Sequence, residues 1–95
     1  MKIAKVGVIG TGVIGKAHLA ALHGQTDFQV VGLADTDPAA LQKAGAQYPY
    51  PRFADAESLF AQGQPDYVVI CTPHFSHAPL AIAAMERGIH ALDVL

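Results

Sequence analysis

Val6-Gly7-Val8-Ile9-Gly10-Thr11-Gly12-Val13-Ile14-Gly15 is the stretch that decides the fold of this chain. Its β-branched beginning predicts a buried strand, and Gly10, Gly12 and Gly15 then have the G-x-G-x-x-G spacing that leads from a strand into a helix. In such a motif the first glycine permits a sharp turn, the second lets a pyrophosphate approach the backbone, and the third lets the helix pack closely. The first N–H groups of the helix would face the phosphates. The stretch therefore predicts a dinucleotide site.

An acidic residue at the end of the next predicted strand supports this interpretation, because glycines in this spacing also occur in ordinary turns. Asp35 follows the apolar segment Phe28–Ala34 and stands about 20 residues after Gly15, the offset expected for a carboxylate that binds the adenosine ribose. Such a carboxylate accepts both ribose hydroxyls and repels a 2′-phosphate, which favours NAD over NADP. A helix cap is the alternative role, but Asp37 before Pro38 fills it better.

Composition and charge exclude several classes of protein. The 95 residues are 52% hydrophobic and 15% charged, which predicts one folded domain. The net charge of −2 without a basic run gives no surface for nucleic acid. The apolar run Tyr67–Cys71 is too short to cross a membrane, and the first strand begins so early that we expect no signal peptide. The single cysteine cannot form an internal disulfide, so we expect a cytoplasmic protein with a buried thiol.

Strand and helix patterns alternate along the chain. Strands are expected at Lys2–Ile9, Phe28–Ala34, Arg52–Phe53, Tyr67–Thr72 and Ile89–Val94, and helices at Val13–His23, Pro38–Ala44, Ala56–Ala61 and His77–Arg87. This alternation predicts an α/β fold with a doubly wound parallel sheet (Rossmann-like), five strands in the order 3-2-1-4-5 and helices on both faces. The switch point between strands one and four would bring Gly10–Gly12, Asp35 and Thr72–His74 to one edge.

Local signals set the expected ends and faces of the helices. Caps are expected at Asp37, Asp55 and Ser76, and helix stops at Gly24, Gly45, Gly63 and Gly88. The residues of the first helix expected to face the sheet are Ile14, Ala17, Ala21 and Leu22.

Three motifs resemble those of the Gfo/Idh/MocA oxidoreductases, which include glucose–fructose oxidoreductase and inositol dehydrogenase. They are Gly10–Gly15 followed by His18 and Leu22, Asp66–Pro73 followed by His77, and Gly88–Leu92. The resemblance covers essentially the whole chain. It implies that residues 1–95 form an N-terminal Rossmann domain that binds NAD or NADP, and that a C-terminal α/β substrate domain is absent from this chain.

The resemblance also implies a reaction and a set of cofactor-binding residues. The reaction is hydride transfer between the nicotinamide and a hydroxyl carbon of a sugar, polyol or derivative. Gly10 to Ile14 would hold the pyrophosphate and Asp35 the ribose, while the segment after the fourth strand would line the cofactor groove. By position, the residues are Gly10, Thr11, Gly12, Val13, Ile14, Gly15, Asp35, Thr72, Pro73, His74 and His77. Family members often have asparagine at the position of His74.

The end of the chain departs from the family pattern. The family continues through a Glu-Lys-Pro triplet whose lysine helps to position and activate the reacting hydroxyl, whereas the aligned residues here are Asp93, Val94 and Leu95. We therefore assign no catalytic residue. We expect the N-terminal part of a dehydrogenase that binds cofactor without turnover and self-associates through an exposed sheet edge or apolar helix faces.

Two other functions fit the same pattern. One is a non-catalytic dinucleotide sensor or regulator, since a fold does not fix a function. The other is a domain for CoA or a mononucleotide, against which Asp35 argues because its carboxylate suits a free ribose diol. Among the histidines, a packing role is favoured for His18, while His77 could contact the cofactor or serve only the helix start. No metal-ligand spacing links His23, His74 or His90 with Cys71.

Overall fold

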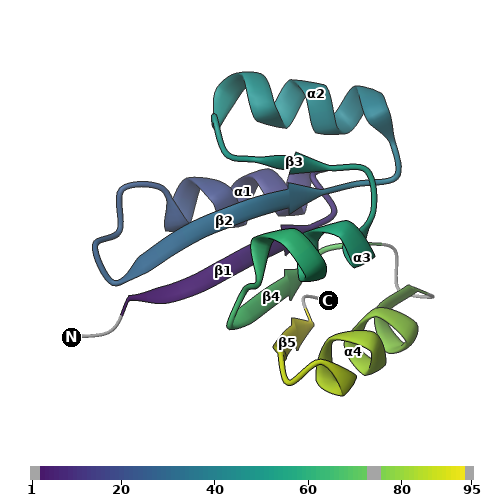
Figure 1. Ribbon diagram of the computed structural model, residues 1–95. Coiled ribbons are helices and arrows are strands. Elements are labelled where there is room, and N and C mark those ends of the chain that lie inside the picture. The colour runs from purple at the N-terminus through teal and green to yellow at the C-terminus, as the bar shows by residue number, and fades with distance from the viewer. Residues whose placement is uncertain (1–2, 73–75, 94–95) are drawn as a thin grey trace.

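A five-stranded parallel sheet lies between two layers of helices in the computed structural model, which describes residues 3–72 and 76–93 (Figure 1). The strands are β1 (Ala4–Ile9), β2 (Phe28–Ala34), β3 (Arg52–Phe53), β4 (Tyr67–Ile70) and β5 (His90–Asp93). The helices are α1 (Val13–Leu22), α2 (Pro38–Gln47), α3 (Ala56–Ser58) with its π-helical continuation η1 (Leu59–Gly63), and α4 (His77–Glu86). The strand order β3-β2-β1-β4-β5 confirms the predicted fold class and topology.

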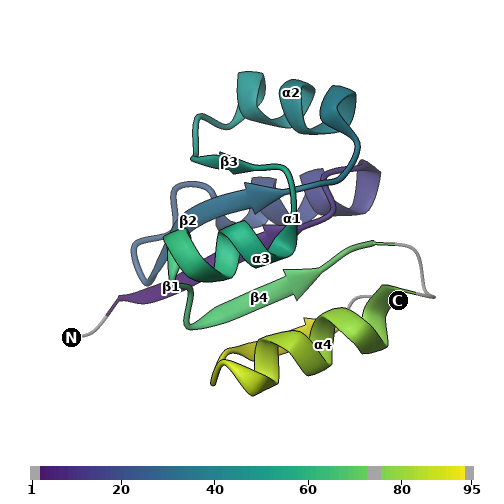
Figure 2. The same cartoon turned by 45° about the vertical axis from the view of Figure 1, so that its right-hand side comes forward.

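Helices cover both faces of the sheet (Figure 2), and each face carries its own core. Helices α1 and α2 cover one face, where the buried residues are Val8, Leu19, Val30, Leu33, Ala44 and Tyr48. Helices α3 and α4 cover the other, where they are Ile9, Ala34, Leu59, Phe60, Val68, Ile70, Ala84 and Ile89. Neighbouring strand residues therefore serve opposite cores, because successive side chains of a strand point to opposite faces. Burial on both faces explains why the central strands are apolar nearly throughout.

The carboxyl ends of the central strands are level with one another. Ile9 of β1 pairs with Ala34 of β2 on one side and with Ile70 of β4 on the other. The loops that follow β1, β2 and β4 consequently leave the sheet at the same edge, as the parallel arrows in Figure 1 show. This edge is the switch point of a doubly wound sheet, where ligands bind in such folds.

The predicted inward face of α1 is only partly correct. Leu22 packs against the core as predicted, and the side chain of Ile14 lies outside the described part of the structure. Ala17 and Ala21 are exposed, whereas Leu19 is fully buried and Gly15 is buried. The cause is the close approach at Gly15, where an added Cβ would lie 1.9 Å from the carbonyl oxygen of Gly10. This contact rotates the helix so that positions 15 and 19, one turn apart, face the sheet.

Two predicted helix ends are also wrong. Helix α2 continues through Gly45 to Gln47. Gly45 does not end the helix but leaves room for the side chain of Arg52, because an added Cβ would lie 2.3 Å from Cδ of Arg52. Helix α3 changes after Ser58 into the wider turns of η1 and extends to Gly63, beyond the predicted end at residue 61.

Most other local predictions are confirmed. Asp37 caps α2 through Oδ1, which accepts from the N–H of Ala39 at 3.1 Å, and Asp55 caps α3 by accepting from the N–H of Ser58 at 2.8 Å. The prediction for Ser76 is confirmed only in position, because Ser76 is the N-cap residue of α4 but its side chain makes no capping hydrogen bond to the helix. Strand β4 ends at Ile70, two residues before the predicted end.

One part of the sheet has no helix over it among the described residues. The right-handed crossovers through α3 and α4 lie on one face, so that the opposite face of β4 and β5 is covered only at its margin by α1. An apolar hollow of about 530 Å³ lies there. Three large side chains that line this hollow are exposed, namely Phe28, Tyr67 and Leu92, and we call the surface that they form the uncovered face. His18 also lines this hollow, in agreement with a packing role.

Candidate cofactor site

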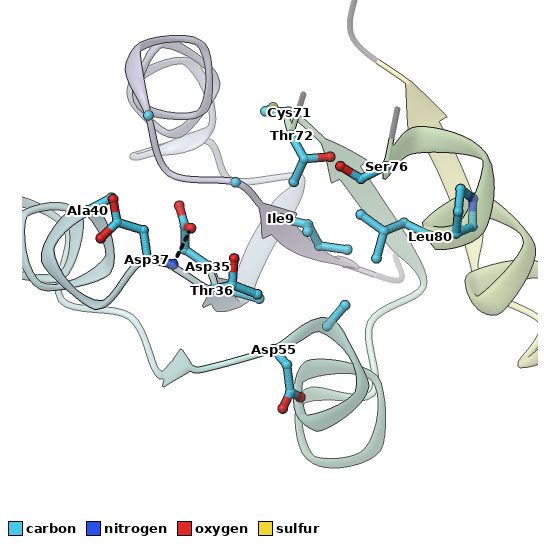
Figure 3. A pocket seen from close by; sticks show the side chains of 15 residues that line it. Ile9, Asp35, Thr36, Asp37, Ala40, Asp55, Cys71, Thr72, Ser76 and Leu80 are labelled. Atoms are coloured by element: carbon cyan, nitrogen blue, oxygen red, sulfur yellow. Dashed lines mark hydrogen bonds between the residues drawn. The ribbon is translucent and has the colours of Figure 1, made fainter. Parts of the chain in front are cut away.

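A groove of about 590 Å³ lies at the carboxyl edge of the sheet, between the glycine turn after β1 and the first turn of α4 (Figure 3). This volume is in the range of small-molecule sites. Four of the predicted site residues line the groove, namely Gly10, Gly12, Asp35 and Thr72. The sequence separates them by more than 60 positions, and the parallel sheet brings them together.

The glycine turn has the shape that the motif predicts. Gly10 has φ of +91°, and a Cβ there would lie 2.8 Å from the carbonyl carbon of Cys71. Gly15 packs against the carbonyl of Gly10, as noted above. Gly12 is different, because a Cβ at this position would meet nothing within 4 Å. The backbone at Gly12 is therefore bare and open at the N-terminus of α1, where an anion is favoured by the helix dipole.

Thr11 connects this turn with the acidic residue after β2. The Thr11 side chain is fully buried. Its backbone N–H and its Oγ1–H both donate to Oδ2 of Asp35, each at 2.8 Å. On the other side, the N–H of Asp37 donates to Oδ1 of Asp35 at 2.9 Å, which Figure 3 draws as a dashed line. The carboxylate of Asp35 is thus held between the glycine turn and the start of α2.

These hydrogen bonds also keep Asp35 ionised. Partial burial by itself raises the pKa of this carboxyl, but the N–H groups of Asp37 and Thr11 and the Thr11 hydroxyl stabilise the charged form. The net result is a pKa below the ordinary value of 3.8. Asp35 therefore presents a negative charge at neutral pH.

Acid is expected to remove the stability that depends on this charge. Because the folded-state pKa of Asp35 is lowered, its contribution is complete above the ordinary value of 3.8 and is lost as the pH falls through the folded-state pKa. Urea unfolding at pH 7 should show Asp35→Asn less stable than the wild type, and this difference in the free energy of unfolding should be smaller at pH 3, below the ordinary pKa of 3.8. The exposed Asp27→Asn variant is the control. A gap of equal size at both pH values would contradict the assignment.

The segment after β4 contributes Thr72 to the groove and His77 behind it. Oγ1 of Thr72 is buried and has no hydrogen-bond partner among the described residues, so it retains the capacity to bind a ligand. His77 is buried, and its Nε2–H donates to the carbonyl oxygen of Thr72 at 2.6 Å. This bond ties the first turn of α4 to the loop. The predicted residues Pro73 and His74 lie outside the described residues.

The groove has further walls that the sequence analysis did not assign to the site. They include Asp37 and Ala40 at the start of α2 and Ser76, Pro79 and Leu80 at the start of α4 (Figure 3). The available signal was topological, because every helix of a parallel sheet begins at the edge where the strands end. Cys71 also lines the groove, and burial raises the pKa of its thiol to about 11. The thiol is therefore neutral at physiological pH and is not an activated nucleophile.

Residues 3–72 and 76–93 contain no group of three or more His, Cys, Asp or Glu side chains that could hold a metal ion. Within the same ranges, no helix combines the length and apolar character that crossing a membrane requires.

Sequence comparison connects this chain with proteins of known kind. Residues 4–93 match the model of the Gfo/Idh/MocA oxidoreductase family, described as an NAD-binding Rossmann fold. The chain is 43% identical over 77 residues to inositol 2-dehydrogenase of Rhizobium meliloti (strain 1021), which covers 80% of this chain and 23% of that protein. It is 36% identical over 97 residues to a glycosyl hydrolase family 109 protein of Stenotrophomonas maltophilia, covering 90% and 21% of the two chains.

Structure comparison agrees. The WlbA dehydrogenase from Bordetella pertussis, crystallised in complex with NADH and UDP-GlcNAcA, superposes with a TM-score of 0.90 at 32% identity, over 97% of this chain and 28% of that one. The chain thus spans about a quarter of the length of these proteins. Since the family model covers nearly all of it, this chain belongs to the Gfo/Idh/MocA oxidoreductase family, in the part that forms the NAD-binding Rossmann fold.

Proposed function

We propose that this chain binds NAD in the groove and supplies the cofactor-binding part of an oxidoreductase. One observation carries the proposal: a bare glycine turn, open at Gly12, and an ionised carboxylate, Asp35, meet at the same groove. A diphosphate and a ribose diol are the two adjacent groups of a dinucleotide that such a pair would recognise.

The residues present fit this cofactor. Gly12 and the N–H groups in the first turn of α1, which includes Val13, Ile14 and Gly15, would hold the diphosphate, because the first N–H groups of a helix lack acceptors within it. Asp35 would bind the adenosine ribose, and its charge would oppose a 2′-phosphate, which favours NAD over NADP. Oγ1 of Thr72 offers a further hydrogen bond, with Pro73, His74 and His77 as proposed neighbours.

The proposed reaction of the parent enzyme is hydride transfer between a nicotinamide and a sugar-like or polyol-like alcohol. Bound NAD would supply the hydride acceptor, while the residues of this chain bind and orient it. The dehydrogenase relatives support this class of substrate by their names and by the UDP-GlcNAcA complex. The glycosyl hydrolase family 109 relative is 36% identical to this domain over 97 residues, so this domain alone does not determine the net reaction.

We also propose a division of labour within the parent protein. Residues 1–95 would form the cofactor domain, and substrate-binding and catalytic residues would belong to a separate domain, in line with the greater length of the relatives. This chain alone would then bind NAD without turnover. Its single, half-buried cysteine supports a reducing compartment such as the cytoplasm.

A fluorescence titration with NADH tests the proposed function. We expect saturable binding with a Kd below roughly 1 mM, weak for a cofactor because only one domain contributes contacts. Circular dichroism on the same sample shows that the chain is folded. Absence of saturation up to about 1 mM NADH in a folded sample would overturn the proposal.

We further propose that the chain self-associates through its exposed apolar side chains. Leu92 on the uncovered face is 56% exposed, and Met85 on α4 is 61% exposed. Large exposed apolar groups of this kind favour association. Light scattering should give a mass above the monomer's 10.0 kDa at high concentration, and Leu92→Lys should lower it. The exposed Gln42→Lys variant on α2 should leave it unchanged, and a strictly monomeric wild type would contradict the proposal.

A further inference from the structure

Thr11 does not act on the cofactor groove directly. Its side chain has no exposed surface, and it is not among the residues that line the groove, although its neighbours Gly10 and Gly12 are. Both of its donors, the backbone N–H and the hydroxyl, are directed to Oδ2 of Asp35 at 2.8 Å. Any influence of Thr11 on a ligand therefore passes through Asp35.

The hydrogen bonds of Asp35 limit what its carboxylate can still accept. An ionised carboxylate has about four acceptor positions, two on each oxygen. Thr11 occupies two positions on Oδ2, and the N–H of Asp37 occupies one on Oδ1. At most one position, on Oδ1, is left for a ribose hydroxyl. The expected acceptance of both ribose hydroxyls would require Thr11 to release Oδ2.

The same bonds fix the place of the negative charge. Asp35 is only half-buried, and an aspartate side chain in such a place can exchange between rotamers. Here two anchors hold it, one from the glycine turn and one from the start of α2. The repulsion of a 2′-phosphate depends on the distance to this charge, so a carboxylate that could swing away would discriminate less.

We propose that Thr11 is a positioning residue whose buried hydroxyl sets the preference of this site for NAD over NADP by holding the Asp35 carboxylate in place. The inference rests on the proposed NAD binding. It gives the middle residue of the G-x-G segment a role in selectivity, exerted by a side chain that never touches the cofactor. The chemistry is a charge-assisted hydrogen bond to a buried donor, which is stronger than a neutral one.

Two substitutions separate the hydroxyl from the shape of the side chain. Thr11→Val keeps the branched form and removes the hydroxyl, whereas Thr11→Ser keeps the hydroxyl and removes the methyl group. For the 95-residue chain, the Kd values for NADH and NADPH are measured by fluorescence. We expect Thr11→Val to bind NADH roughly five- to tenfold more weakly, which corresponds to the typical strength of a charge-assisted hydrogen bond. Its Kd for NADPH should stay within about twofold of the wild-type value. Thr11→Ser should keep the wild-type preference.

A second measurement needs no cofactor. Carbon-detected NMR titration of the free chain follows the Asp35 carboxyl, and its pKa should rise toward the ordinary value in Thr11→Val and stay low in Thr11→Ser. If Thr11→Val does not fold, Thr11→Ala provides the variant without the hydroxyl for both measurements. These readouts report on Asp35 itself, which a merely structural role of Thr11 would not move.

The outcomes separate this inference from the proposed function. A wild type that binds neither NADH nor NADPH would overturn the proposed function and the inference with it. A wild type that binds NADH, together with an unchanged NADH-to-NADPH ratio in the variants without the hydroxyl, would overturn the inference alone. Equal loss of preference in Thr11→Ser and Thr11→Val would also overturn it, because the methyl group and not the hydroxyl would then matter.

Discussion

Gly15→Ala is expected to lower the free energy of unfolding by about 3 kcal/mol or more, the upper end of what overpacking costs. An added Cβ would lie 1.9 Å from the carbonyl oxygen of Gly10 and 2.9 Å from its carbonyl carbon. Both are backbone atoms of a turn that is already fixed by φ of +91° at Gly10, so no side chain can rotate away to make room. Helix α1 would have to move off β1, and the fully buried Leu19 would lose its packing.

Thermal unfolding followed by circular dichroism measures this effect. For a domain of this size, about 3 kcal/mol corresponds to a decrease in Tm of roughly 12 to 24 °C. Gly12→Ala in the same turn is the matched control, because its Cβ would meet nothing within 4 Å and its φ of −73° suits any residue. A Gly15→Ala variant that melts within a few degrees of the wild type would show that α1 does not pack as closely as described.

The topology could be predicted because it depends on signals that are local in the sequence. Apolar runs such as Phe28–Ala34 mark strands, and Asp37 and Asp55 mark helix starts by capping their own helices. Right-handed crossovers then leave few ways to order the strands. The order β3-β2-β1-β4-β5 follows from these signals without knowledge of any long-range contact.

The errors arise where a distant contact decides a local feature. The inward face of α1 is set by the approach of Gly15 to Gly10, which the apolar periodicity of the helix cannot report. Gly45 does not end α2, because it lies within the helix and leaves space for the side chain of Arg52. At Gly15 the motif predicts close packing but not which side of α1 then faces the sheet, whereas at Gly45 a helix stop is predicted and the glycine instead leaves room for the side chain of Arg52.

For the candidate site, the sequence could predict which residues come together but not every contact between them. The convergence of Gly10, Gly12, Asp35 and Thr72 follows from the switch point of the sheet and is confirmed by the groove that they line. The role of Thr11 could not be predicted, because the motif accepts any residue there and the bond to Asp35 forms across 24 positions of sequence. Resemblance placed Thr11 with the pyrophosphate-binding residues, and the structure directs both of its donors to Asp35 instead.

Gly12→Ala is expected to separate binding from folding. The new methyl group would enter open space at the N-terminus of α1, so the free energy of unfolding should change by less than about 1 kcal/mol. Alanine is a weaker N-cap residue than glycine, which destabilises the fold, but it also makes the unfolded chain less flexible, which partly offsets this loss. The same methyl group would stand where the diphosphate must approach the first N–H groups of the helix. Loss of one charge-assisted bond there corresponds to a Kd for NADH raised roughly tenfold to a hundredfold.

Adenosine provides the ligand control for this variant, because it carries the ribose diol but no phosphate. In NMR titrations, Gly12→Ala should bind adenosine as the wild type does, since Asp35 and its partners are unchanged. Asp35→Asn should show the converse pattern, with weaker binding of adenosine and of NADH alike. If Gly12→Ala bound NADH with wild-type affinity, the diphosphate could not lie against this turn, and the proposed role of Gly12 would be wrong.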